Sequence, residues 1–344
     1  MEETALAYFK FRLRNDFLSM NVCVTGGTGF IGGPLVQRLL AAGSTVRVLA
    51  RPSPRADELE SRGAKVVHGQ LSDFEAAARA VEGADVVFHI AAKVNPPGTK
   101  AEFFESNVAG TDNVLKASLQ SGVGKVIYLS SVAVYGLIRA GERIDENTEY
   151  DPAPQFRDYY AQSKIAADAL AISFGKKTGL PIIVLRPGLI YGPGRPLPLG
   201  LLGFPAGRTN VVFGKPGYRV PVNFTENLLD AMQLVSRLSG KGLQQFNIVD
   251  DDDLTLGQYH SILSNLQRKR TVYFPSWPLR AGVPVAEAVM RILPLEPSAC
   301  AALRQVRRAI QDRWYVTRQI REQTGWAPRV ALREAVQRTI AATG

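Results

Sequence analysis

The chain has 344 residues, of which 46% are hydrophobic and 21% charged, and its formal net charge is +10 at pH 7. This length can enclose a large core and suits one α/β unit with an attached lobe. Its two cysteines, Cys23 and Cys300, do not indicate a disulfide framework, so we expect a reducing, cytoplasmic location.

Metal, membrane and nucleic-acid functions find little support in the sequence. The histidines are scattered without metal-ligand spacing, and no apolar run approaches the roughly 20 residues that span a bilayer. Residues 1–19 lack the apolar core and cleavage site of a secretory signal, and we treat them as an N-terminal extension. Arginines recur among acids at helical intervals near the C-terminus, which indicates a solvated helix surface and no nucleic-acid partner. They are Arg304, Arg307, Arg308, Arg313, Arg318, Arg321, Arg329, Arg333 and Arg338.

A glycine-rich turn follows the first predicted strand, MNVCVT at residues 20–25. The turn, VTGGTGFIGG, leads into PLVQRLLAAG, whose apolar spacing predicts a helix. The first N–H groups of such a helix lack internal partners and attract phosphate. Gly26 would permit the tight turn, Gly29 the close approach of a pyrophosphate and Gly32 the packing of helix on strand. Taken alone, the segment also fits an ordinary strand-to-helix loop.

Strands and helices alternate from there to about residue 190. Predicted strands cover residues 44–51, 64–69, 84–92, 123–131 and 180–188, and predicted helices cover 74–83, 103–122 and 158–179. Asp73 is expected to cap the first of these helices. The alternation predicts an α/β fold, a Rossmann-type doubly wound parallel sheet with helices on both faces.

Beyond Arg186 this rhythm breaks. Residues 191–221 are dense in Gly and Pro, 226–238 predict a helix, and 243–249 predict a strand that rejoins the sheet. We therefore expect a dinucleotide-binding domain at 20–190, rejoined by 222–250. A smaller, mainly helical substrate-binding lobe would comprise 191–221 and 251–344. The acidic run at 250–253 lacks the Gly and Glu of a calcium loop, so we expect a turn that caps the next helix.

Two groups on the helix at 158–179 can do chemistry. Tyr160 and Lys164 lie four residues apart and therefore on one helix face. A phenol is a poor acid or base at neutral pH unless a nearby cation stabilises the phenolate, and Lys164 would supply that cation. Ser130 and Ser131 end the strand at 123–131, the edge where ligands of open α/β sheets bind. For Ser130 we expect a plain structural role, capping the following turn.

Seven stretches in this order resemble the extended short-chain dehydrogenases/reductases, the NAD-dependent epimerase/dehydratase group, in its 3β-hydroxysteroid dehydrogenase-like branch. They are TGGTGFIG, FHIAA, SNVAGTDNVL, YLSSVAVYG, YYAQSK, LRPGLIYGPG and GWAP, and they cover nearly the whole chain from Met20. The resemblance implies that Ser131, Tyr160 and Lys164 are catalytic, with Asn107 supporting the site. It also implies a homodimer that pairs through helices 102–121 and 157–178.

The cofactor implied is NADP, with NAD as the alternative. Enzymes that select NAD usually carry a carboxylate after the second strand, whereas this chain has Arg51, helped by Ser53 and Arg55, which suits a 2′-phosphate. The resemblance places the dinucleotide against the glycine turn, the ends of several strands and the catalytic helix. These residues are Gly26, Thr28, Gly29, Phe30, Ile31, Gly32, Arg51, Leu71, Ala91, Ala92, Lys93, Tyr160, Lys164 and Pro187.

The substrate is expected to be a small molecule held near Ser131, Val132, Leu189 and Arg219. Many sugar-nucleotide epimerases carry an Asn where this chain has Leu189, and Arg219 is displaced from their phosphate-binding Arg. We therefore expect hydride transfer between the nicotinamide and a secondary alcohol or ketone of a bulky or cyclic substrate. A nucleotide-sugar epimerase is the alternative, and a dinucleotide-binding regulator without turnover is a third possibility.

Overall fold

The computed structural model describes residues 20–94, 97–136, 142–196, 204–240, 242–267, 270–275 and 312–342. Residues 1–19, Cys300 and the arginines at 304, 307 and 308 lie outside these ranges. The chain forms two compact units. Unit 1 contains the described residues up to Ser130, Ala166–Leu185 and Val235–Gln245; unit 2 contains Ser131–Ile165, Arg186–Leu234 and those from Phe246 on. The expected division into cofactor and substrate domains stays a prediction.

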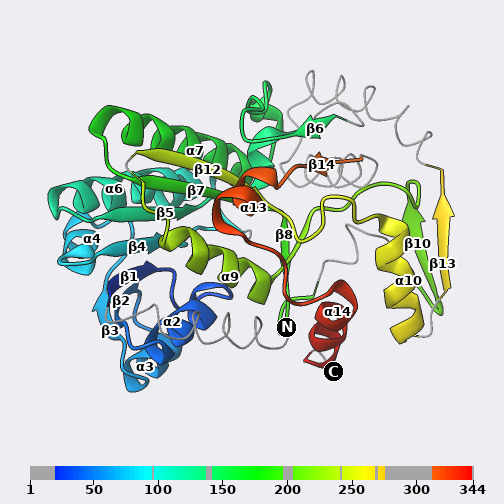
Figure 1. Cartoon of the computed structure of the whole chain (residues 1–344), viewed down its shortest axis with the longest axis horizontal. Coiled ribbons are helices and arrows are strands. Elements are labelled where there is room, and N and C mark those ends of the chain that lie inside the picture. Colours follow the sequence, from blue (N-terminus) through cyan, green and yellow to red (C-terminus); the bar gives the residue numbers. More distant parts are fainter. Residues whose placement is uncertain are drawn as a thin grey trace. The chain divides into compact units, whose positions relative to one another are not determined.

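A seven-stranded sheet has the order β12-β7-β5-β4-β1-β2-β3 (Figure 1). The pairs β1–β2, β2–β3, β1–β4, β4–β5 and β5–β7 are all parallel. The strands are β1 (Asn21–Thr25), β2 (Thr45–Ala50), β3 (Lys65–His68), β4 (Val86–His89), β5 (Lys125–Leu129), β7 (Ile182–Pro187) and β12 (Leu243–Ile248). The strand order reverses between β1 and β4, and ligands of open α/β sheets bind outside the strand ends at such a point. The Rossmann-type sheet and the return of β12 to it are confirmed.

Helices cover both faces of the unit 1 sheet. On one face, α4, α6 and α7 share a core with alternate residues of the strands, among them Cys23, Val87 and Val126. On the other, α2 buries Leu35 and Leu39. The helices are α2 (Gly32–Ala41), α3 (Pro54–Ser61), α4 (Phe74–Val81), α5 (Lys100–Phe104), α6 (Gly110–Gln120) and α7 (Tyr159–Thr178). The side chain of Asp73 accepts from Ala76 N at 3.1 Å and caps α4 as expected.

The helix expected at 103–122 differs from the prediction in one respect. A π-helical segment, η1 (Glu105–Ala109), separates α5 from α6. Each extra residue in such a turn shifts the helical register, and these segments occur frequently at functional sites. Asn107 lies in the middle of η1. Apolar periodicity predicts only that a helix is present, so this local widening was not predictable from it.

In unit 2 the described residues form small sheets and further helices. The strands are β6 (Arg143–Ile144), β8 (Leu189–Tyr191), β9 (Phe204–Ala206), β10 (Thr209–Phe213), β11 (Val222–Phe224), β13 (Arg270–Phe274) and β14 (Trp314–Tyr315). They make a three-stranded sheet, β13-β10-β9, and the pairs β11–β8 and β14–β6. The helices are η2 (Val132–Tyr135), η3 (Pro154–Phe156), α9 (Thr225–Ser236), α10 (Leu256–Gln267), α13 (Arg318–Thr324) and α14 (Leu332–Ala341).

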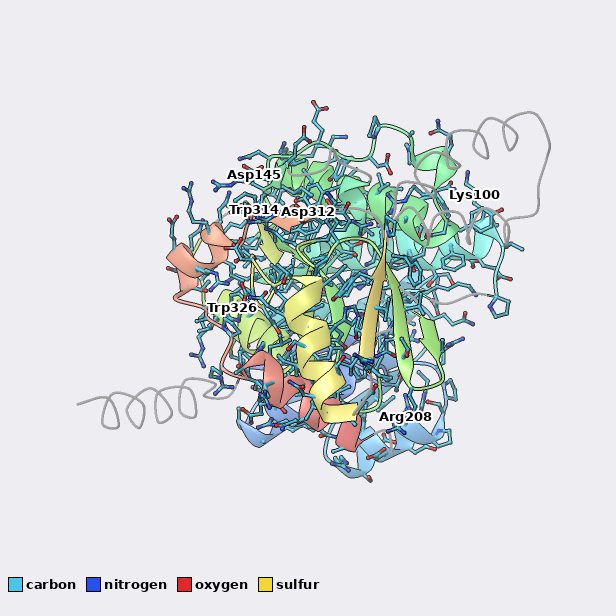
Figure 2. The ribbon with its side chains drawn as sticks, turned by 90° about the vertical axis from the view of Figure 1, so that its right-hand side faces the viewer. Lys100, Asp145, Arg208, Asp312, Trp314 and Trp326 are labelled. Atoms are coloured by element: carbon cyan, nitrogen blue, oxygen red, sulfur yellow. The ribbon has the colours of Figure 1, made fainter. Side chains whose placement is uncertain are left out.

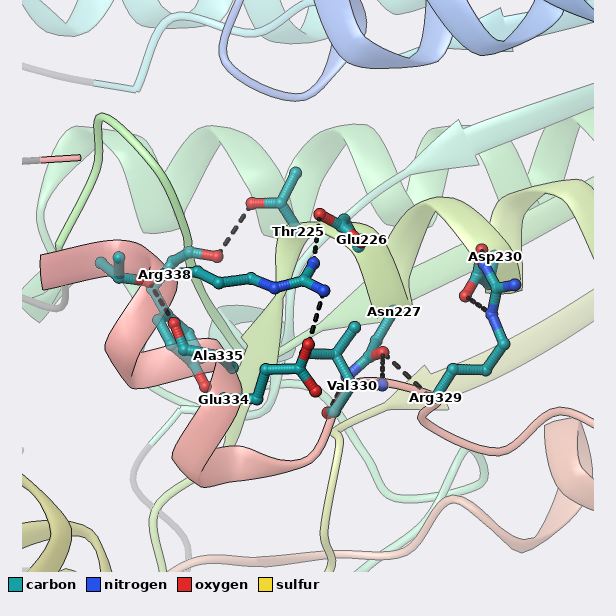
Figure 3. Close-up of polar contacts among 11 residues, drawn as sticks. Thr225, Glu226, Asn227, Asp230, Arg329, Val330, Glu334, Ala335 and Arg338 are labelled. Carbon is teal, nitrogen blue, oxygen red and sulfur yellow. Dashed lines mark hydrogen bonds and ion pairs between the residues drawn. The ribbon is translucent and has the colours of Figure 1, made fainter. Parts of the chain in front are cut away.

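Ion pairs and an asparagine attach the C-terminal segment to α9 (Figure 3). Arg338 contacts Glu226 at 3.0 Å, and Arg329 forms two bonds to Asp230 at 2.6 and 2.5 Å. Asn227 Oδ1 accepts from the backbone N–H of Arg329 at 3.1 Å. Arg338 lies exposed on α14, as expected of a solvated helix surface, whereas Arg329 lies in the segment between α13 and α14.

The acidic run before α10 forms a turn but does not cap the helix, which corrects our expectation. Asp251 Oδ1 accepts from the backbone N–H of Asp253 at 2.9 Å. The cap is Thr255, whose Oγ1 accepts from Gln258 N, while Gln258 Oε1 accepts from Thr255 N at 2.8 Å. This is the reciprocal capping box, which needs a hydroxyl followed three residues later by Gln or Glu.

Candidate active site

The glycine turn between β1 and α2 has the geometry of a dinucleotide cradle. Gly26 has a φ of +75°, a backbone conformation that residues with a side chain rarely adopt. Its carbonyl accepts a hydrogen bond from Gly29 N at 2.9 Å. A Cβ at Gly32 would lie 2.1 Å from Gly26 O. The geometry therefore requires glycine at Gly26, in the tight turn, and at Gly32, where the helix contacts the turn, as predicted.

The electrostatics of this turn favour an anion. Ile31 at the N-cap of α2 provides no side-chain hydrogen bond, and the first turn contains no acidic residue. The first N–H groups of α2 therefore have no side-chain acceptor at the positive end of the helix dipole. Gly29 is exposed, whereas Thr28 and Phe30 are partly buried. The turn thus places backbone N–H groups at the positive end of a helix dipole, which suits an anion such as a pyrophosphate.

Basic side chains flank the turn at the end of β2. Arg51 is exposed, and no ion pair or hydrogen bond joins its side chain to any residue in the described ranges. Arg55 Nη1 donates to Thr28 O at 3.3 Å, which holds this guanidinium beside the glycine turn. Ser53 Oγ accepts from Ala56 N at 3.3 Å and caps α3. Of the three side chains, Arg51 is therefore the one without a competing contact.

The ends of β1 and β4 meet at the point where the strand order reverses. A Cβ on Gly26 would lie 2.8 Å from Ala91 Cα and Ala91 N, so the glycine turn and the segment after β4 touch. Ala92 and Lys93 continue this segment, partly buried. The side-chain amide of Asn107 accepts from Lys93 N at 2.6 Å and donates to Lys93 O at 2.9 Å. The structure thus brings Gly26, Ala91, Lys93 and Asn107 together.

Leu71 lies against α6. A Cβ on Gly110 would come within 2.6 Å of Leu71 Cβ, and Asn113 Nδ2 donates to Leu71 O at 2.9 Å. Its side chain packs on the core formed by β1, β4, β5, β7, α4, α6 and α7. The backbone of Leu71 is therefore firmly held, which is what a contact residue for a ligand requires.

The cap that we expected at Ser130 is made by Ser131 instead. Ser131 Oγ, not Ser130, caps the following turn by accepting from Ala133 N at 3.1 Å. Ser130 is buried and donates to the carboxylate of Asp168 on α7. A hydroxyl can accept and donate at once, and among the described residues nothing accepts the Ser131 proton. Ser131 therefore keeps a donor for a ligand.

Tyr160 and Lys164 lie in the first turns of α7, in unit 2 with Ser131. Asp158 Oδ1 accepts from Ala161 N at 2.8 Å and caps the helix just before Tyr160. The Lys164 side chain is buried and that of Tyr160 is partly exposed. Their spacing of four residues places both side chains on one helix face, where a buried ammonium would favour the phenolate because little water screens the attraction.

Sequence reasoning missed a buried polar cluster that anchors η2. The Tyr135 hydroxyl donates to Asn247 Oδ1 and accepts from Arg186 Nη1, both at 2.7 Å. Glu146 Oε1 accepts from Asn247 N at 2.8 Å, and burial raises the pKa of the Glu146 carboxyl. Tyr135 ends the short helix that begins after Ser131, so these bonds restrict where that serine can lie. No local signal marks this cluster, because its members are far apart in sequence.

A second missed feature is the ion pair between Asp151 and Arg157. Their Oδ2 and Nη1 atoms are 2.8 Å apart, and both side chains are buried. A Cβ on Gly136 would lie 2.2 Å from Asp151 Cγ, so glycine is required for this approach. Gln162 Nε2 donates to Arg157 O at 2.8 Å. The pair therefore fixes the connection that leads into the helix of Tyr160.

The expected substrate residues have different environments. Val132 packs in a core cluster with Tyr135 and Tyr315, and Pro187 is buried at the end of β7. Leu189 is partly buried and packs on the cluster around β8, β11 and α10. Arg219 Nη1 contacts Asp312 at 2.8 Å, and its guanidinium lies 4.2 Å from the ring centroid of Trp314; Figure 2 labels Asp312 and Trp314. Arg219 is thus already paired within unit 2.

Among the described residues there is neither a helix suited to span a membrane nor a metal-ligand cluster. None of their helices combines the length and apolar character needed to cross a membrane. They contain no group of three or more His, Cys, Asp or Glu side chains arranged to hold a metal ion.

Several known proteins have similar sequences or a similar structure. The chain is 35% identical over 201 residues to a 2-alkyl-3-oxoalkanoate reductase of Shewanella oneidensis, covering 57% of this chain and 49% of that relative. It is 32% identical over 233 residues to a 3 beta-hydroxysteroid dehydrogenase/Delta 5-->4-isomerase of Mycobacterium tuberculosis, covering 62% and 60%. The solved structure of gox2253 superposes with a TM-score of 0.77 at 25% identity, over 94% of this chain and 98% of that one.

The region that a family model matches includes the glycine turn, the serine pair and the helix of Tyr160. The chain spans about half the length of the curated relatives it matches. The model of the NAD dependent epimerase/dehydratase family matches residues 22–237. The chain therefore belongs to the NAD dependent epimerase/dehydratase family.

Proposed function

We propose that the protein is an NADP-dependent oxidoreductase acting on a secondary alcohol or ketone of a bulky or cyclic substrate. The observation that carries this proposal is the Ser131 hydroxyl, whose proton no described residue accepts, in one compact unit with Tyr160 and Lys164. The nicotinamide would donate or accept the hydride. Relatives named as a reductase and a hydroxysteroid dehydrogenase support this class of chemistry.

The residues divide the proton chemistry between them. In the reducing direction Tyr160 donates its proton to the substrate oxygen as negative charge develops there. Ser131 donates a hydrogen bond to the same oxygen and stabilises that charge. The Lys164 ammonium stabilises the phenolate that remains on Tyr160. In the oxidising direction the proton returns along the same path.

Substitution of Tyr160 by Phe tests this mechanism. We expect turnover of an accepted ketone to fall by at least about 100-fold, the lower range for general acid catalysis, while cofactor affinity largely survives. Tyr159→Phe is the matched control, because Tyr159 is the neighbouring partly buried tyrosine on the same helix. Unchanged turnover in Tyr160→Phe would refute the mechanism.

The preference for NADP follows from the charge at the end of β2. Arg51 is exposed and unpaired within the described residues, and no carboxylate occupies that position to bind ribose hydroxyls. We expect Arg51→Ala to weaken NADPH binding by about ten-fold, the effect of roughly 1.4 kcal/mol, and to change NADH binding little. Arg62→Ala is the control, because Arg62 is an exposed arginine paired with Glu58. Equal effects on both cofactors would contradict the 2′-phosphate contact.

A nucleotide-sugar epimerase remains the second candidate, because the same Ser, Tyr and Lys serve that reaction in the family that the sequence resembles. Two observations count against it. The side chain of Leu189 cannot hydrogen-bond a diphosphate, and Arg219 is already paired with Asp312 and stacked on Trp314. Screening apolar ketones against UDP- and dTDP-sugars separates the two candidates. A regulator without turnover would bind the cofactor and turn over neither group.

We further propose a cytoplasmic homodimer that uses α7. Between Ala166 and Gly175 this helix carries one charged residue, Asp168, and that side chain is fully buried. Ala169 and Ser173 are partly exposed there. A surface helix without solvated charges suits burial against a second copy. Sedimentation of wild type and Ala169→Arg tests this, since a monomeric wild type would refute it.

A further inference from the structure

A chain of buried hydrogen bonds crosses unit 1 from β1 to α6 through His89. Thr25 Oγ1 lies 2.8 Å from His89 Nδ1, and His89 Nε2 lies 2.9 Å from Thr111 Oγ1. Thr111 Oγ1 donates to Asn107 O at 2.6 Å, and Ala91 N donates to Thr25 Oγ1 at 3.3 Å. The side chains of Thr25 and His89 have no exposed surface, so water cannot replace these partners.

The geometry assigns a direction to every bond in this chain. A carbonyl only accepts, so the one proton of the Thr111 hydroxyl goes to Asn107 O, and Thr111 must accept from His89 Nε2–H. A backbone N–H only donates, so Thr25 Oγ1 accepts from Ala91 N. The Thr25 proton then has His89 Nδ1 as its acceptor. His89 is therefore in the tautomer that carries its proton on Nε2.

The chain ends on both sides of the segment that follows β4. At one end Thr25 accepts from Ala91 N, where a Cβ on Gly26 would lie 2.8 Å away. At the other end Asn107, whose carbonyl accepts from Thr111, forms two side-chain bonds to the backbone of Lys93. Residues 91–93 are thus held at both ends by one network. His89 contacts both Thr25 and Thr111 and so joins the two ends.

We propose that His89 is a positioning residue that, as the Nε2–H tautomer, holds the backbone of residues 91–93 beside the glycine turn for the dinucleotide. The tautomer is part of the proposal because the donor in one hydrogen bond determines the donor in the next. If Nδ1 carried the proton, His89 would donate to Thr25, and the Thr25 proton would lose its acceptor. The tyrosine ring of Tyr128 stacks on the imidazole at 5.4 Å between centroids and keeps the ring from turning.

The tautomer is tested directly by the ¹⁵N spectrum of the imidazoles, with no cofactor added. The chain has three histidines, and substitution of His68 and His260 assigns the remaining signal to His89. We expect the Nε2–H form in wild type and in Thr111→Ser, which keeps the acceptor. Thr111→Val removes the acceptor and should convert His89 to the Nδ1–H form. An Nδ1–H signal in wild type, or no change in Thr111→Val, would overturn the assignment.

The functional consequence is tested by cofactor titration and amide hydrogen exchange. This part depends on the proposed cofactor role, whereas the tautomer does not. We expect Thr111→Val and His89→Phe to weaken NADPH binding about ten-fold and to speed exchange at Ala91 N–H and Lys93 N–H by a similar factor. Thr111→Ser should restore both values. Faster exchange with unchanged affinity would overturn the positioning role, whereas a wild type that binds neither NADPH nor NADH would instead refute the proposed function.

Thr339→Val is the matched control for loss of a buried threonine hydroxyl. Thr339 is buried on α14, and its Oγ1 donates to Ala335 O at 2.7 Å, just as Thr111 donates to the carbonyl four residues before it. It belongs to unit 2, whereas His89 and Thr111 belong to unit 1. We expect wild-type cofactor affinity and an unchanged His89 spectrum in this variant. A loss of affinity equal to that of Thr111→Val would show a general stability effect and overturn the proposal.

Discussion

The guanidinium of Arg157 contacts the carboxylate of Asp151 at 2.8 Å, and both side chains are buried. Asp151 also accepts from Ala153 N at 3.0 Å, so its second oxygen is satisfied as well. The charges lie in the connection that ends at the cap of α7, immediately before Tyr160. A buried pair of this kind adds little net stability, but the removal of one partner leaves the other charge without compensation.

We therefore expect Arg157→Met to lower the free energy of unfolding by about 3 to 5 kcal/mol. Urea denaturation measures this loss. Arg318→Met is the control, because Arg318 pairs with Glu322 on the surface of α13 at 78% and 65% exposure and should matter much less. Similar losses in both variants would show that burial of the Asp151–Arg157 pair is not what makes it important.

Gly32 and Gly33 offer a neighbouring pair with opposite expectations. A Cβ at Gly32 would lie 2.1 Å from Gly26 O, whereas at Gly33 the nearest atom, Gly27 O, would be 3.4 Å away. Gly32→Ala should therefore displace the glycine turn, cost about 1 to 3 kcal/mol of stability and abolish dinucleotide binding. Gly33→Ala should keep binding and stabilise α2 by up to about 1 kcal/mol. Calorimetric titration with NADPH and thermal unfolding measure both effects, and tight binding by Gly32→Ala would contradict the close contact.

Substitution of the two adjacent serines should affect stability and turnover differently. Ser130→Ala removes a buried donor to Asp168 and should lower stability by about 1 to 3 kcal/mol. Ser131→Ala removes a cap to Ala133 N, so stability should fall by about 1 kcal/mol while turnover falls strongly. Unfolding curves and steady-state kinetics on the two variants measure this contrast. The reverse pattern would identify Ser130 as the functional hydroxyl.

Asp250 should make the stability of unit 2 depend on pH. Burial raises the pKa of Asp250 to about 7. Hydrogen bonds from Phe224 N, Asn227 and Asn223 and the charge of Arg321 lower the pKa, but burial has the larger effect. Between the unfolded value of 3.8 and about 7, the folded state holds a proton that the unfolded state has lost. The free energy of unfolding therefore falls as pH rises through this window, by up to about 1.4 kcal/mol per pH unit from this group.

Asp250→Asn removes this contribution. Between pH 5 and pH 8 the free energy of unfolding of the wild type should therefore fall relative to that of the variant. Urea denaturation at several pH values measures the difference. The raised pKa of Glu146 acts in the same direction but is present in both proteins, so it cancels from the comparison. A difference that does not vary with pH would contradict the raised pKa of Asp250.

Local sequence patterns were sufficient for most of unit 1. The apolar runs predicted the strands, and the spacing of the glycines predicted the turn, because Gly26 must adopt positive φ and Gly32 must leave no side chain. Asp73 was identifiable as a cap because an acceptor directly before an amphipathic helix has few other local roles. Each of these features depends on residues that are near neighbours along the chain.

The misassigned caps show where local reasoning ends. Thr255, not the acidic run before it, caps α10, and Ser131, not Ser130, caps η2. In each case several adjacent side chains had the right chemistry. The choice among them was made by other elements: Asp168 on α7 takes the Ser130 proton, and Asp250 accepts from β11 and α9.

From residue types and spacing alone, the chain can be assigned a dinucleotide turn, a parallel sheet and a Tyr–Lys pair on one helix face. Which polar groups pair was settled by the folded chain: the buried His89 with Thr25, 64 residues away, and the partly buried Arg219 with Asp312, 93 residues away. The spacing of apolar residues shows which side chains become buried, but their hydrogen-bond partners are set by the elements that the fold brings together. A buried donor or acceptor must find its partner there, because an unsatisfied one costs more than most single contacts contribute.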